Sequence, residues 1–287
     1  MAQRKTDLSN DLRLCFVMAA SPTDGFFSQI AMFRLALNSL GGIYKAADIY
    51  LSLGDEKIVD IPERWRRHLA QGVIIHWADP SQFQTIGLRA QGDNKWKYDY
   101  KDYDLIIFCD ADTILITPLD ELLVTTKKMN GISGVIAHYP FPHEQGENLN
   151  VLWQSLSRQI IGKSIPLDYT YSLLDADEGN EHAKCPFYLN FGFVVMTPQV
   201  FYKIRTTYLK MRLDMAPLLK EPVFSGQIAL TFAVFSHDVP VHAAEMKYNF
   251  PNDPVAEQLY SDQLKSISVI HYLRTNHFDR QKINDRN

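Results

Sequence analysis

The sequence lacks any apolar run long enough to cross a membrane, and its N-terminus, MAQRKTDLSNDLRL, lacks the apolar core of a secretory signal peptide. A membrane-spanning helix needs about 20 consecutive apolar residues, and a signal peptide needs an apolar segment of about 7–15 residues. These absences predict a soluble, cytoplasmic protein without a transmembrane segment.

Cysteine and excess basic charge are also scarce. The three cysteines, Cys15, Cys109 and Cys185, are scattered, which favours reduced structural thiols over a disulfide framework or a zinc site. The formal net charge of −4 provides no electrostatic basis for binding nucleic acid or an anionic membrane. A nucleotide ligand would therefore need local cations or a metal ion.

What the sequence does contain is an alternation of strand-like apolar runs and amphipathic helical patterns. Residues 12–20 predict a strand, residues 26–40 a helix ended by Gly41 and Gly42, and residues 47–53 and 72–77 two further strands. This order predicts an α/β fold with a mixed, mainly parallel sheet flanked by helices. The length of 287 residues allows one elaborate or two small domains, and we predict a single domain over residues 1–287.

The second half of the chain continues the alternation around an irregular region at residues 139–184. Ser225 is predicted to be the N-cap of a helix that runs to Phe235. A polar connection that contains RWRRHL leads to the strand expected at residues 72–77. The other expected elements are helices over residues 118–128, 149–161 and 198–213, and strands over residues 132–138, 187–197, 239–242 and 266–272.

Two aspartates follow a continuous apolar run in the stretch YDLIIFCDADTIL, residues 103–115. Leu105–Cys109 predicts a strand buried on both faces, and Asp110 and Asp112 then come with only Ala111 between them. Residues two apart in a strand point the same way, about 6.6 Å apart, so we expect both carboxylates on one side. Ligands bind at strand ends in open α/β sheets, and we predict that the pair holds a divalent metal and, through it, a diphosphate. A solvated turn or an N-cap pair is the alternative.

Four separated segments, in the same order along the chain, resemble glycosyltransferase family 8, which includes glycogenin and bacterial lipopolysaccharide galactosyltransferases. YDLIIFCDADTIL resembles the metal-binding DxD stretch of the GT-A glycosyltransferases, and FYLNFGFVVMTP resembles the family's N-x-G strand. SGQIALTFAVF followed by VPVHAAEMKYNF is similar to its Asp-Gln helix and the following strand, and SVIHYLRTNH to its C-terminal histidine motif. The resemblance implies a GT-A (Rossmann-like) fold, with a nucleotide-binding half at 12–137, an acceptor- and sugar-binding half at 138–250 and a C-terminal extension at 251–287.

The resemblance also implies a metal site. Asp112 would bind the metal directly, Asp110 would share it, and His271 would be the third protein ligand. Carboxylate oxygens with one imidazole suit Mn²⁺, with Mg²⁺ as the alternative. The metal would neutralise the diphosphate as the sugar leaves. The alternative for His271 is a buried histidine satisfied by hydrogen bonds.

Further positions correspond to the family's contacts with a nucleotide sugar. The resemblance implies that Gln227 and Asn190 are the catalytic candidates, since Gln227 would lie near the anomeric carbon and Asn190 would contact the donor sugar. Several of these positions also have a structural alternative. Ala19, Ala20 and Ser21 would lie in an ordinary loop at the end of the first strand, and Lys95 would be a solvated lysine. Asn190 and Gly192 would form a strand bulge, and Arg274 and His277 would belong to a basic tail. The predicted nucleotide- and sugar-binding residues are Ala19, Ala20, Ser21, Asp24, Lys95, Asp110, Ala111, Asn190, Gly192, Gln227, Arg274 and His277.

Two positions depart from the family pattern. Gly226 replaces the aspartate that precedes the family's glutamine, and His277 replaces its phosphate-binding lysine, with Arg274 close by. The glycine removes a candidate for stabilising an oxocarbenium-like transition state. Retention of configuration is implied by the resemblance, and Gly226 leaves inversion open.

The resemblance therefore implies a metal-dependent hexosyltransferase that moves a sugar from a nucleoside diphosphate donor, most simply a UDP-sugar, to an unknown acceptor (a glycan, a lipid-linked sugar or a small molecule). A phosphatase of the haloacid dehalogenase type also carries a strand followed by DxD. Here, however, Ile114 occupies the position where that class has Thr or Val, and no lysine with paired acids follows. A non-catalytic nucleotide-sugar-binding protein is the other alternative, because Gly226 replaces an acid.

Overall fold

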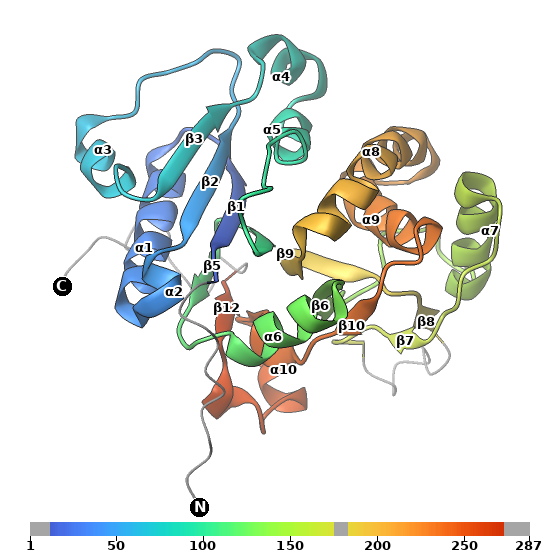
Figure 1. Cartoon of the computed structure of the whole chain (residues 1–287). Coiled ribbons are helices and arrows are strands. Elements are labelled where there is room, and N and C mark those ends of the chain that lie inside the picture. Colours follow the sequence, from blue (N-terminus) through green and yellow to red (C-terminus); the bar gives the residue numbers. More distant parts are fainter. Residues whose placement is uncertain (1–11, 175–182, 273–287) are drawn as a thin grey trace, which may run out of the picture.

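A seven-stranded mixed sheet flanked by helices forms the centre of the computed structural model, which describes residues 12–174 and 183–272 (Figure 1). The strand order is β10-β6-β9-β4-β1-β2-β3, and only β9 runs antiparallel to its neighbours, β4 and β6. The predicted mixed, mainly parallel sheet is therefore confirmed. The strands are β1 (Leu14–Ala20), β2 (Asp48–Leu53), β3 (Val73–Trp77), β4 (Leu105–Cys109), β6 (Ile132–Ile136), β9 (Leu189–Met196) and β10 (Val241–Ala243).

Helices connect the strands and cover the sheet. They are α1 (Asp24–Leu40), α2 (Gly42–Lys45), α3 (Glu63–Leu69), α4 (Pro80–Ile86), α5 (Arg89–Asn94), α6 (Asp120–Met129), α7 (Leu149–Ile161), α8 (Pro198–Met215), α9 (Ser225–Ser236) and α10 (Pro254–Leu259). In Figure 1, α5 lies beside β1 and β2, on the side toward α8 and α9.

The central strands are buried on both faces. Successive residues of a strand point to opposite sides, and Phe16 of β1 packs into one hydrophobic cluster whereas Cys15 and Val17 pack into the other. In β4, Ile107 and Phe108 divide in the same way. The continuous apolar runs of these strands therefore have a packing explanation, since neither face meets water.

Several helix boundaries follow from local sequence. The Thr23 side chain accepts a hydrogen bond from the Phe26 amide at the start of α1, and Gly41, with φ 72°, ends the helix. Asn148 caps α7 in the same manner through the Asn150 and Val151 amides, and α7 covers the predicted residues 149–161.

Two local predictions are wrong. Ser225 is not an N-cap but the first residue of α9, because the turn at Pro222–Phe224 is already helical and the Pro222 carbonyl accepts the Ser225 amide. The helix predicted from Pro118 begins at Asp120. The polar connection that contains RWRRHL folds as the short helix α3.

Two smaller sheets stand beside the main one. β5 (Thr113–Leu115) pairs antiparallel with β12 (Val269–His271), which pairs with β11 (Phe250–Pro251); β7 (Tyr169–Thr170) pairs with β8 (Lys184–Cys185). The first of these sheets joins the end of the described chain to the segment that follows β4.

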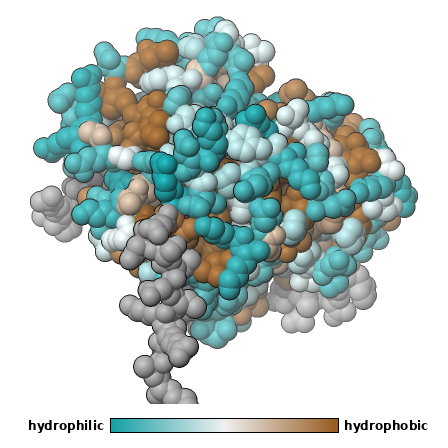
Figure 2. All heavy atoms as spheres, viewed as in Figure 1, coloured by the Kyte–Doolittle hydropathy of each residue, from teal (hydrophilic) through white to brown (hydrophobic). Residues whose placement is uncertain are grey.

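The surface view in Figure 2 shows hydrophilic side chains interspersed with apolar ones. None of the helices in the part of the chain that the structure describes is long and apolar enough to span a bilayer.

Candidate active site

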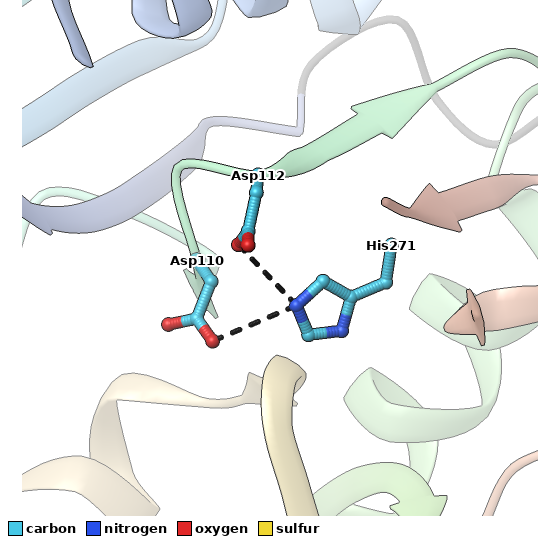
Figure 3. A group of neighbouring side chains, drawn as sticks. All are labelled: Asp110, Asp112 and His271. Carbon is cyan, nitrogen blue, oxygen red and sulfur yellow. Dashed lines mark ion pairs between the residues drawn. The ribbon is translucent and has the colours of Figure 1, made fainter. Parts of the chain in front are cut away.

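Asp110, Asp112 and His271 converge at the carboxyl end of the central strand β4 (Figure 3). The His271 Nε2 atom lies 3.3 Å from Asp112 Oδ1 and 3.8 Å from Asp110 Oδ2. One ligand atom from each of the three side chains lies within 4.8 Å of the others. Asp110 follows β4, Asp112 precedes β5 and His271 ends β12, so three elements supply the cluster.

The backbone of the DxD segment is a turn, and the prediction that both aspartates lie in one strand is wrong. The amide and hydroxyl of Thr113 both donate to the Asp110 carbonyl, at 3.2 and 2.7 Å. The Tyr272 amide donates to the Asp112 carbonyl at 2.9 Å. These bonds orient the two carboxylates toward the same imidazole, which is the outcome that strand geometry had been expected to produce.

His271 has the surroundings of a ligand rather than of a core residue. Its side chain is 1% exposed, and neither ring nitrogen has a hydrogen-bond partner among the described residues. A buried polar group without a partner costs free energy, so the alternative of a histidine satisfied by hydrogen bonds does not fit. A neutral imidazole and two carboxylates are together a suitable donor set for Mn²⁺ or Mg²⁺.

Charge is crowded around Asp110. The surrounding protein raises the pKa of the Asp110 carboxyl by desolvation, His271 and Lys95 oppose this shift, and Asp112 adds to it. Burial lowers the pKa of Lys95, and the negative charge of Asp110 opposes that shift. Lys95 Nζ lies 5.2 Å from the centroid of the Phe108 ring. Lys95 therefore belongs to the electrostatic environment of the carboxylate pair.

Asn190 and Gly192 lie against this cluster. The Gly192 amide donates to Asn190 Oδ1 at 2.8 Å, and the Gly192 carbonyl accepts from the Asp110 amide at 3.1 Å. A Cβ at position 192 would come closer than 3.0 Å to both Nδ1 and Cε1 of His271. Glycine is therefore required sterically at this position, since the imidazole occupies the space of a side chain.

Gln227 and Gly226 stand in the first turn of α9. The Tyr188 hydroxyl donates to Gln227 Oε1 at 2.9 Å. A Cβ at position 226 would lie 3.2 Å from the Tyr208 hydroxyl and 3.4 Å from Cε2 of Phe191, the residue between Asn190 and Gly192. The first turn of α9 therefore packs against Phe191, which lies between Asn190 and Gly192 in β9.

The residues predicted to contact the nucleotide lie at the carboxyl end of β1, on the same side of the sheet as the DxD segment that follows β4. Ala19 and Ala20 end β1, Ser21 follows, and β1 runs parallel to β4, so the carboxyl ends of both strands lie at the same edge. Ala20 is buried, whereas Ala19 and Ser21 are partly accessible. Ala111 is buried, and its carbonyl accepts from the Tyr272 hydroxyl at 3.4 Å.

Asp24 makes its contacts with α3. It accepts a hydrogen bond from Trp65 Nε1 at 2.7 Å and forms an ion pair with Arg64. The bond from Trp65, and then the charge of Arg64, lower the pKa of the Asp24 carboxyl. Arg274 and His277 lie outside the described residues.

Some polar residues near the site carry no recognisable sequence pattern. Arg89 and Asp93 of α5 and Arg212 of α8 come together beside Gly226, although Arg212 lies far from the other two in sequence. No spacing rule relates such positions, and only the packing of α5 against α8 and α9 reveals them.

Comparison of the structure with solved structures identifies its fold. It resembles the galactosyltransferase LgtC, solved with donor and acceptor sugar analogues, at a TM-score of 0.53 and 16% identity, over 94% of this chain and 93% of that one. It also resembles mouse xyloside xylosyltransferase 1 (TM-score 0.54, 12% identity, 91% of this chain and 98% of that one). A third match is the bifunctional glycosyltransferase WbbM (TM-score 0.54, 13% identity, 92% of this chain and 46% of that one).

These similarities show that the chain has the GT-A fold, as its sequence predicts. No protein-family model matches the sequence. No curated protein matches it either. The fold class is thus shared with glycosyltransferases at a sequence identity too low to carry over the role of any residue.

Proposed function

We propose that this protein is a metal-dependent glycosyltransferase that moves a hexose from a nucleoside diphosphate donor, most simply a UDP-sugar, to an acceptor. The observation that carries the proposal is the convergence of Asp110, Asp112 and the buried His271 at the carboxyl end of β4 in a GT-A fold. The ring nitrogens of His271 make no hydrogen bond within the described part of the chain. The similarity to LgtC, solved with donor and acceptor sugar analogues, supports a sugar donor and a sugar-like acceptor.

Asp110, Asp112 and His271 would hold Mn²⁺, or Mg²⁺ in its place. When bound, the metal would supply positive charge to a departing diphosphate. Lys95 adds a cation beside Asp110, which favours an anionic ligand there and orients it toward the carboxylate pair. In this proposal the nucleoside lies along Ala19–Ser21, within the half of the chain at residues 12–137.

Asn190 and Gln227 would contact the donor sugar. Amide groups both donate and accept hydrogen bonds, so each suits a sugar hydroxyl. Gln227 is held by Tyr188 through its Oε1 atom, which fixes the orientation of the amide and directs its N–H₂ group away from Tyr188. A retaining reaction is proposed on the strength of this glutamine, with the acceptor bound by residues 138–250.

Trp153 and Tyr171, two aromatic residues of that region, are buried in the core, where the Trp153 indole N–H donates to the Tyr171 hydroxyl. The three cysteines are all buried and free, which supports a cytoplasmic location.

The haloacid dehalogenase alternative is not favoured, because the solved structures that the chain resembles are glycosyltransferases.

Ligand-induced thermal stabilisation tests the proposal. A ligand at 100 times its Kd stabilises a protein by about 2.7 kcal/mol, so UDP with Mn²⁺ should raise the melting temperature of the wild type. Asp112→Asn removes a metal ligand and should abolish both this increase and metal-dependent donor hydrolysis. Asp102→Asn, which changes an exposed aspartate, is the matched control.

Retention of the Mn²⁺-dependent increase and of donor hydrolysis in Asp112→Asn would refute the metal site. Release of inorganic phosphate from a phosphomonoester by the wild type would favour the phosphatase instead. Binding of nucleotide sugars without transfer or hydrolysis would identify a non-catalytic binding protein.

A further inference from the structure

Arg212 is almost completely buried between α5 and the first turn of α9. Its side chain is 10% exposed and forms an ion pair with Asp93 through Nη1. A Cβ at Gly92 would lie 3.6 Å from Nη1, and a Cβ at Gly226 would lie 3.9 Å from Nε. The guanidinium is thus sandwiched between two glycines, and its Nε atom has no hydrogen-bond partner among the described residues.

Arg89 places a second guanidinium in the same region. Its Nε atom is also buried without a partner, and within residues 12–174 and 183–272 no carboxylate forms an ion pair with it. Burial and the nearby charge of Arg89 lower the pKa of Arg212 to about 10. Arg212 is therefore paired with Asp93, whereas Arg89, one helical turn before Asp93 on α5, is partly exposed and has no carboxylate partner among the described residues. The positive charge of Arg89 favours the approach of an anion.

Uncharged groups that favour an anion lie beside Gly226. The Ser225 hydroxyl is 0% exposed and has no hydrogen-bond partner among the described residues. The Tyr208 hydroxyl would lie 3.2 Å from a Cβ at Gly226. The 12-residue helix α9 begins here without a side-chain cap, and a helix N-terminus attracts negative charge. The first turn of α9 therefore places the buried Ser225 hydroxyl next to Gly226, the residue against which Arg212 Nε lies.

This region adjoins the candidate donor site without belonging to the metal cluster. Trp96 stacks on Tyr208, with centroids 3.9 Å apart, and packs edge-on against Phe108 at 4.9 Å. Lys95 Nζ lies over the Phe108 ring, 5.2 Å from its centroid, and its charge interacts with Asp110. Gln227, the proposed contact of the donor sugar, directly follows Gly226. Arg212 therefore lies against the residue that precedes the expected sugar contact, whereas Lys95 is the cation beside the metal cluster.

We propose that Arg89 and Arg212 form a subsite for a carboxylate on the donor sugar, so that the donor is a nucleoside diphosphate hexuronic acid. The planar fork of a guanidinium matches a carboxylate. The single uncompensated charge matches one carboxylate better than a phosphate dianion. Gly226 fits the same assignment, because an acidic side chain there would compete with the ligand for Arg212 Nε. This inference rests on the function proposed above and specifies its substrate class.

Calorimetric titration with two matched donors tests the inference. UDP-glucuronic acid and UDP-glucose differ only by the carboxylate at C6, and UDP alone reports the nucleotide site. With Mn²⁺ present, we expect the wild type to bind the uronic acid at least about tenfold more tightly than the glucose donor, the factor that one charge-assisted contact of roughly 1.4 kcal/mol provides. Arg89→Gln should remove this preference while the affinity for UDP stays unchanged.

Arg89→Gln is the informative variant because Arg89 has no ion pair to lose, so no carboxylate is stranded. Arg212→Gln alone would strand Asp93, and it is therefore combined with Asp93→Asn as a second, charge-balanced variant. Arg67→Gln, at an exposed arginine of α3, is the control for loss of one positive charge. It should retain the preference.

Equal binding of the two donors by the wild type overturns the inference, and so does a preference that survives in both Arg89→Gln and the double variant. If UDP-glucose binds more tightly only when methyl β-glucuronide is also present, that result would assign the carboxylate to the acceptor and overturn the donor assignment. Failure of UDP with Mn²⁺ to bind at all would instead contradict the glycosyltransferase proposal itself, which separates the two failures.

Discussion

Replacing Gly192 by alanine tests the arrangement of the metal cluster without changing any ligand. The added Cβ would lie closer than 3.0 Å to Nδ1 and Cε1 of His271 and 2.9 Å from Asn190 Oδ1. Ordinary van der Waals contact begins at about 3.4 Å, so the imidazole must retreat by more than about 0.4 Å. Metal–ligand distances tolerate about 0.2 Å. His271 is 1% exposed and pairs with β5 and β11 through its backbone, which leaves little room for such a shift.

The expected result is a large loss of metal affinity with a modest loss of stability. Overpacking of a buried site costs about 1–3 kcal/mol, and each kcal/mol lowers the melting temperature of a large domain by about 2–4 °C. Misorientation of a ligand lowers metal affinity by about 10- to 100-fold, and we expect Gly192→Ala to reach at least this range. Calorimetric titration with Mn²⁺ and thermal unfolding of the metal-free protein measure the two quantities separately.

Gly25→Ala is the matched control, because a Cβ at Gly25 meets only Thr23 Oγ1, at 4.0 Å. This position lies in α1, where alanine is favoured over glycine by about 0.5–1 kcal/mol, so the control should bind Mn²⁺ normally and unfold at a slightly higher temperature. Affinity of Gly192→Ala for Mn²⁺ within about twofold of the wild type would contradict the reasoning, since a clash of this size cannot leave a ligating His271 in place.

Three further predictions follow from the contacts. Tyr188→Phe removes the hydrogen bond to Gln227 and should lower kcat for donor turnover with a stability loss of about 1 kcal/mol; an unchanged kcat would exclude a positioning role for Tyr188. Tyr171→Phe leaves the indole N–H of the fully buried Trp153 without an acceptor and should cost about 1–3 kcal/mol in urea unfolding, and a neutral result would contradict the contact. The pKa of Asp24 is lowered in the folded state from 3.8, so its stabilising contribution is present above that pH and is lost as the pH falls through the folded pKa. The difference in melting temperature between wild type and Asp24→Asn should therefore shrink as the pH falls below 3.8, and a difference that stays constant as the pH falls would refute the linkage.

Part of the site could be predicted from the sequence because its signals are local. The apolar run Leu105–Cys109 predicted a strand buried on both faces, and the acids that follow it were expected at a strand end; both are confirmed. The bounds of α7 were predicted from its amphipathic pattern, and in the structure an asparagine cap and a C-terminal glycine delimit the helix. The role of His271 depended on a family resemblance, and its position beside Asp112 agrees with that prediction.

Other features could not be predicted because they depend on which elements pack together. Ser225 has the residue type of an N-cap, but the preceding helical turn makes it part of α9. The DxD segment turns where a continuing strand had been expected, because Thr113 and Tyr272 bind its carbonyls. Arg89 and Arg212 lie on different helices, and nothing in the spacing of the sequence relates them.

By itself, the sequence determined the alternation of buried strands and covering helices and the placement of two acids after an apolar strand, because hydrophobic periodicity and capping act within a few residues. Only the tertiary structure decided that the imidazole of His271 meets those acids, and that Arg212 pairs with Asp93 and lies beside Gly226. These contacts join residues from distant parts of the chain. The packing of one element on another determines them, and no local pattern in the sequence records it.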